Sequence, residues 1–344
     1  CPRRQCVSDS APMDYPEHRV LSGIQPSGTL HLGNYFGAIR QHIELQDEFP
    51  GECFYFIADY HSLTTVRDAE KLRGLVHDVA VTYLSLGLDP AKATLWRQSD
   101  VPEVTELTWL LSTVTGMGLL ERAHSYKDKV AKGIKPTMGL FNYPVLMASD
   151  ILIYGSSVVP VGKDQVQHVE MTQDMATHFN EIYGETLRRP EWRLSETPKV
   201  PGIDGDKMSK SYGNTIDIFA SGKKLKKRCG QVVTDSTEFG EPLPVEDVPV
   251  LDLISLFVEE AELEEVKGWF RDAKRDGETF GLGHAKGFLA EKIDAQFAEA
   301  RERREHFLAN PDEVEAILVS GAERARAEAR KTIDACRKAC GLTK

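Results

Sequence analysis

Apolar and polar positions follow two alternating periods through the first two thirds of the chain. Short runs rich in β-branched and aromatic residues lie at residues 19–23, 53–59, 93–97 and 157–161. Stretches with helical periodicity, such as residues 70–86, separate these runs. Strands that alternate with helices in this way predict a parallel sheet with helices on both faces. The predicted fold class for this part is therefore α/β, with a doubly wound sheet.

Helical patterns alone follow after about residue 215. They lie at residues 223–232, 249–267, 284–307 and 310–340. The last of them has the residue types that begin and end helices, with Asn310 as a cap, Pro311 at the first position and Gly341 at the finish. We therefore expect an α/β domain over residues 14–215 and an all-helical domain over residues 216–344.

Two segments depart from this two-domain pattern. Residues from about 105 to 140 form a long insertion that is apolar around Trp109 and basic from Arg122 onward. This mixture is compatible with a subunit interface, a flap over a substrate, or both. Residues 1–13 are polar and charged, so we expect a disordered extension there, with Met13 nearer to the functional start.

Charge and composition narrow the class of protein. The formal net charge of -11 excludes a general nucleic-acid coat protein, because non-specific phosphate binding needs many unpaired cations. No run of about 18 apolar residues occurs, and the opening of the chain lacks the apolar core of a secretory leader, which predicts a soluble cytoplasmic protein. The cysteines contain no Cys-x-x-Cys pair. Cys336 and Cys340 continue an apolar helical stripe, so buried packing is favoured there over a metal site.

The first candidate site is the loop at residues 22–34, Ser-Gly-Ile-Gln-Pro-Ser-Gly-Thr-Leu-His-Leu-Gly-Asn, between the first strand and a helix. Nucleotides bind at the carboxyl ends of strands in open α/β sheets. Gly23, Gly28 and Gly33 let the backbone turn and approach a ligand. The helix that begins near Leu32 directs amide N–H groups at phosphate. A triphosphate suits this loop, although an ordinary glycine-rich connection has the same composition.

A second loop favours a nucleotide site over an ordinary glycine-rich connection. Residues 207–211, Lys-Met-Ser-Lys-Ser, follow the last predicted strand. Attack of a carboxylate on the α-phosphorus of ATP builds negative charge on the departing pyrophosphate, so catalysis needs positioned cations and N–H donors. The predicted catalytic residues, which supply such groups, are His31, Asn34, Lys207 and Lys210. No Gly-x-x-x-x-Gly-Lys-Ser/Thr motif competes with these loops.

Together the two loops make the chain resemble the class I aminoacyl-tRNA synthetases. His-Leu-Gly-Asn at residues 31–34 stands for the His-Ile-Gly-His-like signature of that class, and residues 207–211 stand for its Lys-Met-Ser-Lys-Ser loop. The segments similar to its tryptophan branch are Asn34 with the residues 23–28 before it, Tyr-Pro-Val-Leu-Met-Ala-Ser-Asp-Ile-Leu at 143–152 and Val-Pro-Val-Gly-Lys-Asp-Gln-Val-Gln-His at 159–168. The resemblance implies a Rossmann-like catalytic domain, a helical domain that reads the anticodon, and a homodimer.

The resemblance also implies a reaction and its residues. L-tryptophan is activated with ATP, accompanied by Mg²⁺, and is then transferred to tRNA(Trp). Asp150 accepts the indole N–H, while Tyr143 and Gln165 hold the ammonium group. An apolar helix face that carries one carboxylate suits a flat ring with one N–H donor. ATP contacts are implied for Gln25, Pro26, Ser27, Gly33, Asn34, Gly162, Lys163, Asp164, Val200, Lys207, Met208, Ser209, Lys210 and Ser211. No protein metal ligand is implied.

Three other interpretations stay open. They are a tyrosine-specific synthetase, a nucleotidyltransferase of the same superfamily that acts without RNA, and a non-catalytic paralogue. Leu21 favours tryptophan, because tyrosine-specific relatives usually place a tyrosine there. The long helical part favours a tRNA partner, and the intact Lys207 and Lys210 favour an active enzyme. Neither a membrane nor DNA is expected as a partner.

Several side chains keep two interpretations. Asp150 could instead cap a helix or form an ion pair, and His61 could line the site or be structural. Lys163 could contact phosphate or face solvent. The densest basic run could meet the acceptor arm of tRNA or form a solvated helix face, and it consists of Lys223, Lys224, Lys226, Lys227 and Arg228.

Overall fold

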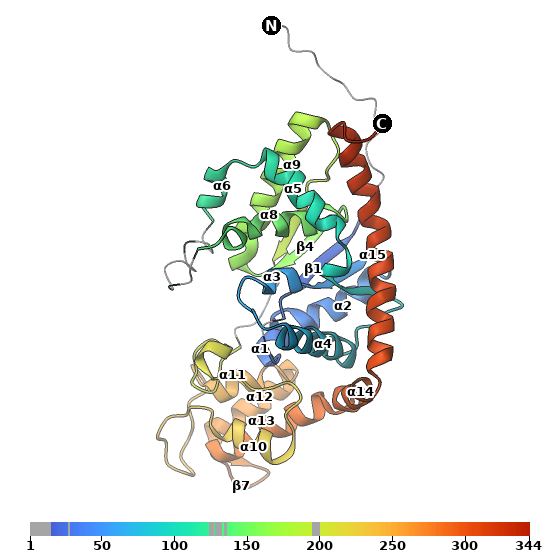
Figure 1. Cartoon of the computed structure of the whole chain (residues 1–344). Helices are drawn as coiled ribbons and strands as arrows, with labels where there is room; N and C mark the ends of the chain where they lie inside the picture. Colours follow the sequence, from blue (N-terminus) through green and yellow to red (C-terminus); the bar gives the residue numbers. More distant parts are fainter. Residues whose placement is uncertain (1–14, 27, 124–126, 128–132, 134–135, 195–199) are drawn as a thin grey trace.

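The computed structural model describes residues 15–26, 28–123, 127, 133, 136–194 and 200–344 (Figure 1). The extension expected at residues 1–13 lies outside these ranges, as does much of the basic half of the insertion. Within these ranges no helix is both long enough and apolar enough to span a membrane.

Five parallel strands form the main sheet of the described chain. They are β1 (Val20–Ile24), β2 (Cys53–Ile57), β3 (Ala93–Arg97), β4 (Val158–Val161) and β5 (Glu191–Leu194), in the order β3-β2-β1-β4-β5. The chain builds the sheet from β1 in one direction and then, with β4, in the other, which confirms the doubly wound arrangement. β5 was not predicted, because it is an exposed edge strand in which every second residue is charged.

Neighbouring residues of each strand send their side chains to opposite faces of the sheet. Val20 and Tyr55 belong to one buried cluster, whereas Leu21 and Phe54 belong to the other. All five residues of β2 are buried, because helices cover both faces. This explains why the central strands were recognisable as continuous apolar runs.

Helices lie on both faces of this sheet (Figure 1). On the face of Val20 are α1 (Leu32–Asn34), a π-helical turn (Tyr35–Ile39), α2 (Arg40–Glu48) and α4 (Ala69–Ser85). On the face of Leu21 are α5 (Glu103–Val114), α8 (Met138–Leu152) and α9 (Val166–Tyr183). Shorter elements between them are α3 (Asp59–Ser62), α6 (Met117–Glu121) and the 3-10 turns Gln98–Asp100 and Lys163–Gln165.

The chain after residue 215 is helical, as predicted. The helices are α10 (Gly222–Gly230), α11 (Pro249–Ile254), α12 (Glu260–Asp272), α13 (Leu282–Gln296), α14 (Ala298–Ala309) and α15 (Pro311–Ala339). Two of the predicted helices are each divided in two. The break between α13 and α14 falls at Phe297, whose buried ring packs 4.9 Å from that of Tyr35. A small hairpin of β6 (Lys274–Arg275) and β7 (Glu278–Thr279) is an addition that the sequence pattern did not indicate.

α15 leaves the other helices and runs back along the sheet domain, as the long red helix of Figure 1 shows. Ala325 and Ile333 are fully buried in the same cluster as Leu21. An ion pair of 2.9 Å joins Glu328 to Arg19 at the start of β1. α15 was assigned to the helical domain by its place in the sequence, but it packs with the first domain.

The predicted end signals of α15 hold in part. Pro311 occupies the first turn, and Gly341 has a φ of 73° just past the end. Asn310 stands at the cap position, but its side-chain amide donates to the His306 carbonyl (2.7 Å) and does not cap α15. Cys336 is buried in the packing face of the helix, as predicted.

Gly321 lets α15 approach β3 closely. A Cβ atom at this position would overlap the backbone carbonyl of Leu95, which cannot rotate away. We expect Gly321→Ala to lower the free energy of unfolding by roughly 2 kcal/mol or more, as overpacking in a core does. Urea denaturation measures the change. The control is Gly287→Ala in α13, where no atom lies within 4 Å and alanine should stabilise by about 0.5–1 kcal/mol. Equal losses in both variants would contradict the close approach.

Candidate active site

The early loop and the predicted segment after β4 lie where the strand order reverses. β1 and β4 are neighbours, but in the described sheet they pair at Val20 and Val158 alone, near the start of both strands. The carboxyl ends of strands at such a switch point are where open α/β sheets bind ligands. The early loop (residues 22–34) follows β1, and Gly162 follows β4. The topology therefore places both candidate segments at the expected ligand site.

His31 begins the helix that follows the early loop. Its backbone N–H donates to Asn34 Oδ1 (3.1 Å), and the Asn34 N–H donates to the His31 carbonyl (2.8 Å). Gly33 has little room for a side chain, because a Cβ atom would lie 3.0 Å from the His31 imidazole. The signature residues are therefore held in place by bonds among themselves.

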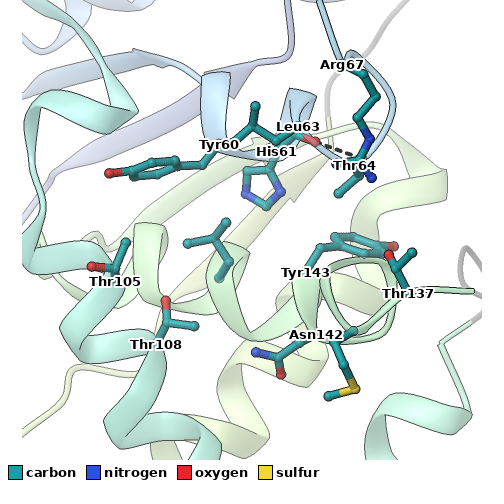
Figure 2. A pocket seen from close by; sticks show the side chains of 13 residues that line it. Tyr60, His61, Leu63, Thr64, Arg67, Thr105, Thr108, Thr137, Asn142 and Tyr143 are labelled. Atoms are coloured by element: carbon teal, nitrogen blue, oxygen red, sulfur yellow. Dashed lines mark hydrogen bonds between the residues drawn. The ribbon is translucent and has the colours of Figure 1, made fainter.

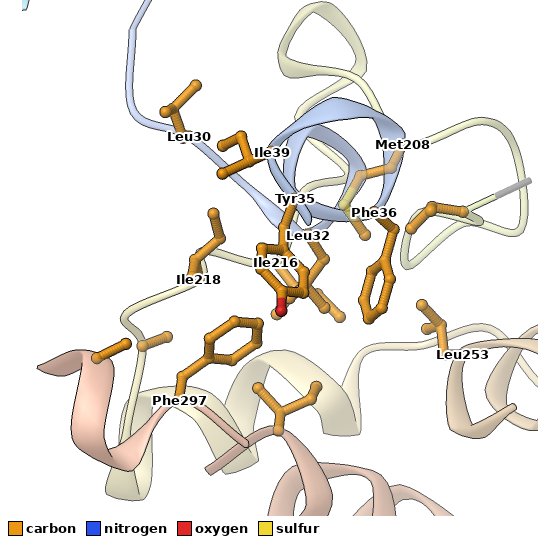
Figure 3. Close-up of a cluster of buried hydrophobic side chains, with 14 of the residues drawn as sticks. Leu30, Leu32, Tyr35, Phe36, Ile39, Met208, Ile216, Ile218, Leu253 and Phe297 are labelled. Atoms are coloured by element: carbon orange, nitrogen blue, oxygen red, sulfur yellow. The ribbon is translucent and has the colours of Figure 1, made fainter. Parts of the chain in front are cut away.

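The late loop (residues 207–211) contacts the early loop. Lys210 Nζ donates to the Gly28 carbonyl (2.8 Å), although 182 positions separate the two residues. The Gly33 N–H donates to Met208 Sδ (3.3 Å), and the buried Met208 side chain lies beside Leu32 in the apolar cluster of Figure 3. One residue of the late loop thus anchors it in the core, and another reaches across to the early loop.

Three of the four predicted catalytic residues are brought together. Lys210 is close enough to His31 to perturb its ionisation, and His31 bonds to Asn34. Lys207 is exposed. The structure therefore assembles a group of donors and one cation at the switch point.

The His31 imidazole is kept neutral. Its exposed fraction is 6%, and within the described chain its Nδ1 is buried without a hydrogen-bond partner. Burial, and secondly the Lys210 ammonium, lower the pKa of His31 to about 4. A neutral imidazole can donate an N–H to a phosphate oxygen without itself carrying charge.

Buried histidines should make the stability of the fold depend on pH. Burial lowers the pKa of His42 to about 4, as for His31. Between pH 6.5 and 4 the unfolded chain binds protons that the folded chain does not, so stability falls as the pH falls. We expect a loss of roughly 2 kcal/mol per histidine between pH 7.5 and 5, measured by urea denaturation. His42→Gln should remove its share of the pH dependence, whereas His178→Gln, at an exposed site, should not. Identical pH profiles for the two variants would contradict this.

Asp150 is a buried carboxylate held by two neighbours. It lies on α8 with an exposed fraction of 1%. Gln98 Nε2 donates to both of its oxygens (2.9 and 2.8 Å), and His61 Nε2 lies 3.0 Å from Oδ2. Burial raises the pKa of Asp150, and the contacts with His61 and Gln98 oppose this rise. Because His61 follows β2 and Gln98 follows β3, the carboxylate lies at the ligand-binding edge of the sheet.

A cavity of about 590 Å³ opens beside His61 and Tyr143 (Figure 2). The Tyr143 hydroxyl forms a hydrogen bond of 2.7 Å with His168 Nε2, which orients the ring. Other lining residues come from α5, α8 and the turn after α3, are mostly apolar or carry hydroxyls, and include Leu63, Thr64, Thr105, Thr108 and Leu146. Tyr143 therefore lines the cavity, and Asp150 is connected to it through His61.

The predicted ATP segment after β4 forms a 3-10 turn. Gly162 is the cap of this turn, which runs from Lys163 to Gln165. Lys163 is exposed and Gln165 is half-buried. The side chain of Asp164 lies outside the part of the chain that the structure describes.

The remaining predicted ATP contacts lie on the two loops, apart from Val200, which is bonded to the late loop. Gln25 is exposed, and its Nε2 donates to the His61 carbonyl at 3.5 Å. Pro26 and Val200 are buried, and the Val200 carbonyl accepts from Met208 N–H (3.0 Å). Ser209 and Ser211 share a hydrogen bond between their hydroxyls (2.9 Å), and Ser27 lies outside the described residues.

Two residues that hold parts of the site in position were not predicted from the sequence. Gln98 binds both oxygens of Asp150, and its position directly after β3 was a signal that could have indicated it. Asn214 is buried and holds the late loop together. No pattern in the sequence distinguished Asn214 from an ordinary loop residue.

The basic run lies on α10. Lys223, Lys224, Lys226 and Lys227 are exposed. Arg228 is half-buried and bonds to the Gly213 and Thr215 carbonyls just after the late loop. The run therefore contains four lysines that face solvent and one half-buried arginine.

Comparison with protein families and curated proteins gives consistent matches. The family model described as tRNA synthetases class I (W and Y) matches residues 14–295. A tryptophan–tRNA ligase of Rhodopirellula baltica is 51% identical over 325 residues, covering 94% of this chain and 99% of that protein. A tryptophan–tRNA ligase of Fusobacterium nucleatum is 52% identical over 326 residues, covering 94% and 98%.

Solved structures give the same result for the fold. The tryptophanyl-tRNA synthetase of Campylobacter jejuni, complexed with ADP and tryptophan, is 48% identical with a TM-score of 0.87. The match covers 94% of this chain and 99% of that one. The similarity therefore extends over both the sheet domain and the helical region.

Proposed function

Because this chain belongs to the class I tRNA synthetases for tryptophan and tyrosine, we infer that it works as a tryptophan–tRNA ligase. It activates L-tryptophan with ATP, releasing pyrophosphate, and transfers the tryptophanyl group from the adenylate to tRNA(Trp). The observation that carries this inference is the bond from Lys210 to Gly28, which joins the two predicted nucleotide-binding loops at the switch point of the sheet.

In this proposal ATP lies at the carboxyl ends of β1 and β4. The position of the early loop at the switch point supports it, as do the bond from Lys210 to Gly28 and the ADP in the relative from Campylobacter jejuni. The residues proposed to contact ATP are Gln25, Pro26, Ser27, Gly33, Asn34, Gly162, Lys163, Asp164, Val200, Lys207, Met208, Ser209, Lys210 and Ser211.

The adenylation step calls for positive charge and N–H donors. A tryptophan carboxylate oxygen attacks the α-phosphorus, and the bond from that phosphorus to the pyrophosphate oxygen breaks. Lys207 and Lys210 stabilise the charge that develops on pyrophosphate, while neutral His31 and the Asn34 amide donate hydrogen bonds. A neutral His31 suits this role, because it can bind phosphate without a change of protonation.

Mg²⁺ is proposed to enter bound to the phosphates of ATP, whose charge it helps to neutralise. Across residues 15–344, apart from the gaps noted above, no group of three or more His, Cys, Asp or Glu side chains is arranged to hold a metal ion. Both lysines of the late loop act on the same phosphates.

Tryptophan is proposed to bind with its indole N–H on Asp150 and its ammonium on Tyr143 and Gln165. A carboxylate offers about four acceptor positions. Gln98 and His61 occupy three, so about one remains for the indole. Leu21, an apolar residue on the sheet face that α8 covers, favours indole over a phenol hydroxyl.

A homodimer and a tRNA-binding helical region complete the proposal. Trp109, Met117 and Met138 are 70%, 66% and 76% exposed on α5, α6 and α8, and α8 contacts both of the other helices. Large exposed apolar side chains of this kind support a subunit interface. The helices after residue 215 are proposed to read the anticodon. Since the reaction uses tRNA and ATP, we place it in the cytoplasm.

Exchange of labelled pyrophosphate into ATP tests the proposed reaction. Each of the twenty amino acids is supplied separately with Mg²⁺. We expect exchange with tryptophan alone, and charging when tRNA(Trp) is added. Exchange with tyrosine would keep the adenylation chemistry and contradict the Asp150 pocket. Absence of exchange with every amino acid would contradict the enzymatic function.

A further inference from the structure

The late loop keeps its internal shape through one buried amide. Asn214, with an exposed fraction of 2%, accepts from the Ser209 N–H at 2.7 Å. Its Nδ2 donates to Asp204 Oδ1 (2.8 Å) and to the Lys207 carbonyl (3.1 Å). All of these partners belong to residues 204–214. They therefore shape the loop without fixing it relative to the helical region.

Arg228 of α10 binds the loop from outside. Its Nη2 donates to the Gly213 carbonyl (2.6 Å) and its Nε to the Thr215 carbonyl (2.7 Å). Its Nη1 donates to Gln231 Oε1 (3.0 Å), which steadies the guanidinium from the end of the same helix. The planar arginine fork can satisfy two backbone carbonyls at once, and a lysine ammonium lacks this fixed geometry. We call these bonds to Gly213 and Thr215 the Arg228 clasp.

Gly213, the first of the two residues bound by the clasp, directly follows the turn that carries Lys210. Lys210 begins a 3-10 turn that ends at Tyr212, and Gly213 follows with a φ of 66°. A glycine in this left-handed conformation allows the chain to reverse after the turn. The clasp therefore holds the point at which the lysine-bearing turn rejoins the chain.

The second carbonyl lies beside the early loop. After Thr215, the Ile216 carbonyl accepts from Leu32 N–H (3.0 Å). Asp217 then forms a bridge with His31. The segment from Lys210 to Asp217 thus carries the proposed catalytic lysine at one end and the bridge partner of His31 at the other. Arg228 binds this segment at Gly213 and Thr215, between the two ends.

The other cations of α10 are different. Lys223, Lys224, Lys226 and Lys227 are exposed, whereas Arg228 is half-buried and uses three of its nitrogens. A solvated helix face explains the lysines. It does not explain an arginine that is bonded to two main-chain oxygens.

We propose that Arg228 is a positioning residue for adenylate formation, an inference that rests on the proposed function. It touches neither ATP nor tryptophan. By holding Gly213 and Thr215, it keeps Lys210 where the departing pyrophosphate needs a cation. Without the clasp, the loop spends less time in the competent position, and the rate of the step falls in proportion to that population.

Arg228→Gln, Arg228→Lys and Lys227→Gln test the clasp by tryptophan-dependent pyrophosphate exchange, which involves no tRNA. Lys227→Gln removes the same charge from the same helix at an exposed position. We expect Arg228→Gln to lower kcat by roughly 10- to 100-fold, with the Kd for tryptophan within about twofold of the wild type. Arg228→Lys should fall between the two, and Lys227→Gln should match the wild type.

Three outcomes would overturn the proposal while the wild type still exchanges. In the first, Arg228→Gln exchanges as fast as Lys227→Gln. In the second, tryptophan affinity falls as much as kcat, in Arg228→Gln and in the conservative Arg228→Lys, which indicates a general structural role. In the third, exchange is unchanged and only tRNA charging falls, which makes Arg228 an RNA contact. Absence of exchange in the wild type would instead contradict the proposed function.

Discussion

Replacing Lys210 by alanine should lower the rate of adenylate formation by roughly 10²- to 10³-fold, with tryptophan affinity within about twofold of the wild type. The reason is geometric. Lys210 Nζ bonds to the Gly28 carbonyl, so its charge lies between the two loops, where pyrophosphate has to leave. A group that acts mainly on developing charge changes kcat more than ground-state binding. Pyrophosphate exchange measures the rate, and calorimetric titration measures the Kd for tryptophan.

The matched control for Lys210 is Lys224→Ala. Lys224 is an exposed cation of α10, so its loss changes the net charge by the same amount away from the two loops. We expect wild-type exchange from that variant. Normal turnover of Lys210→Ala would remove the late loop from the mechanism, and an equal defect in both variants would indicate an effect of net charge.

Replacing Asp150 by alanine should lower kcat/KM for tryptophan by roughly 10³-fold, with little change in the KM for ATP. The indole N–H would lose its acceptor, and Gln98 Nε2, which donates to both oxygens of Asp150, would be left buried without them. Asp150→Asn should lose less, roughly 10- to 100-fold, because an amide oxygen still accepts while the amide nitrogen opposes Gln98. Pyrophosphate exchange at varied tryptophan and ATP concentrations measures both constants.

Asp59→Asn serves as the control for Asp150. Asp59 is a second buried carboxylate at the same edge of the sheet, and it accepts from the Ser99 and Tyr60 N–H groups. Its replacement should lower stability but leave kcat/KM for tryptophan within about fivefold. An Asp150→Ala enzyme that keeps its tryptophan KM would show that Asp150 only pairs with His61 and Gln98.

The central strands could be predicted from the sequence because parallel strands buried on both faces form continuous apolar runs. β3 was predicted with its observed ends, Ala93 and Arg97. β5 could not be predicted, because an exposed edge strand forms by pairing with its neighbour, here β4, and its own residues are not a hydrophobic run. The break at Phe297 was equally hidden, since it depends on where that ring packs against Tyr35.

The chemistry of the site could be predicted further than its geometry. The two loops carry recognisable residue types, so their pairing was an expectation from sequence. The bond from Lys210 to Gly28 was not, because it depends on how a loop 182 positions away folds back. The tertiary partners of Asp150 were also hidden, since Gln98 and His61 meet it only when the ends of β2 and β3 come together with α8. The roles of these residues stay predictions for the experiments above.

The return of α15 to the sheet also has a consequence for synthesis on the ribosome. β3 and the face of Leu21 are made early, yet the helix that covers them, Pro311–Ala339, emerges long after them. Until then the nascent chain exposes an apolar surface that later belongs to its core, a state prone to aggregation. Contacts of such long sequence separation also slow folding. A transcript truncated before α15 should therefore yield aggregated protein, even though every residue proposed to bind ATP or tryptophan has already been translated.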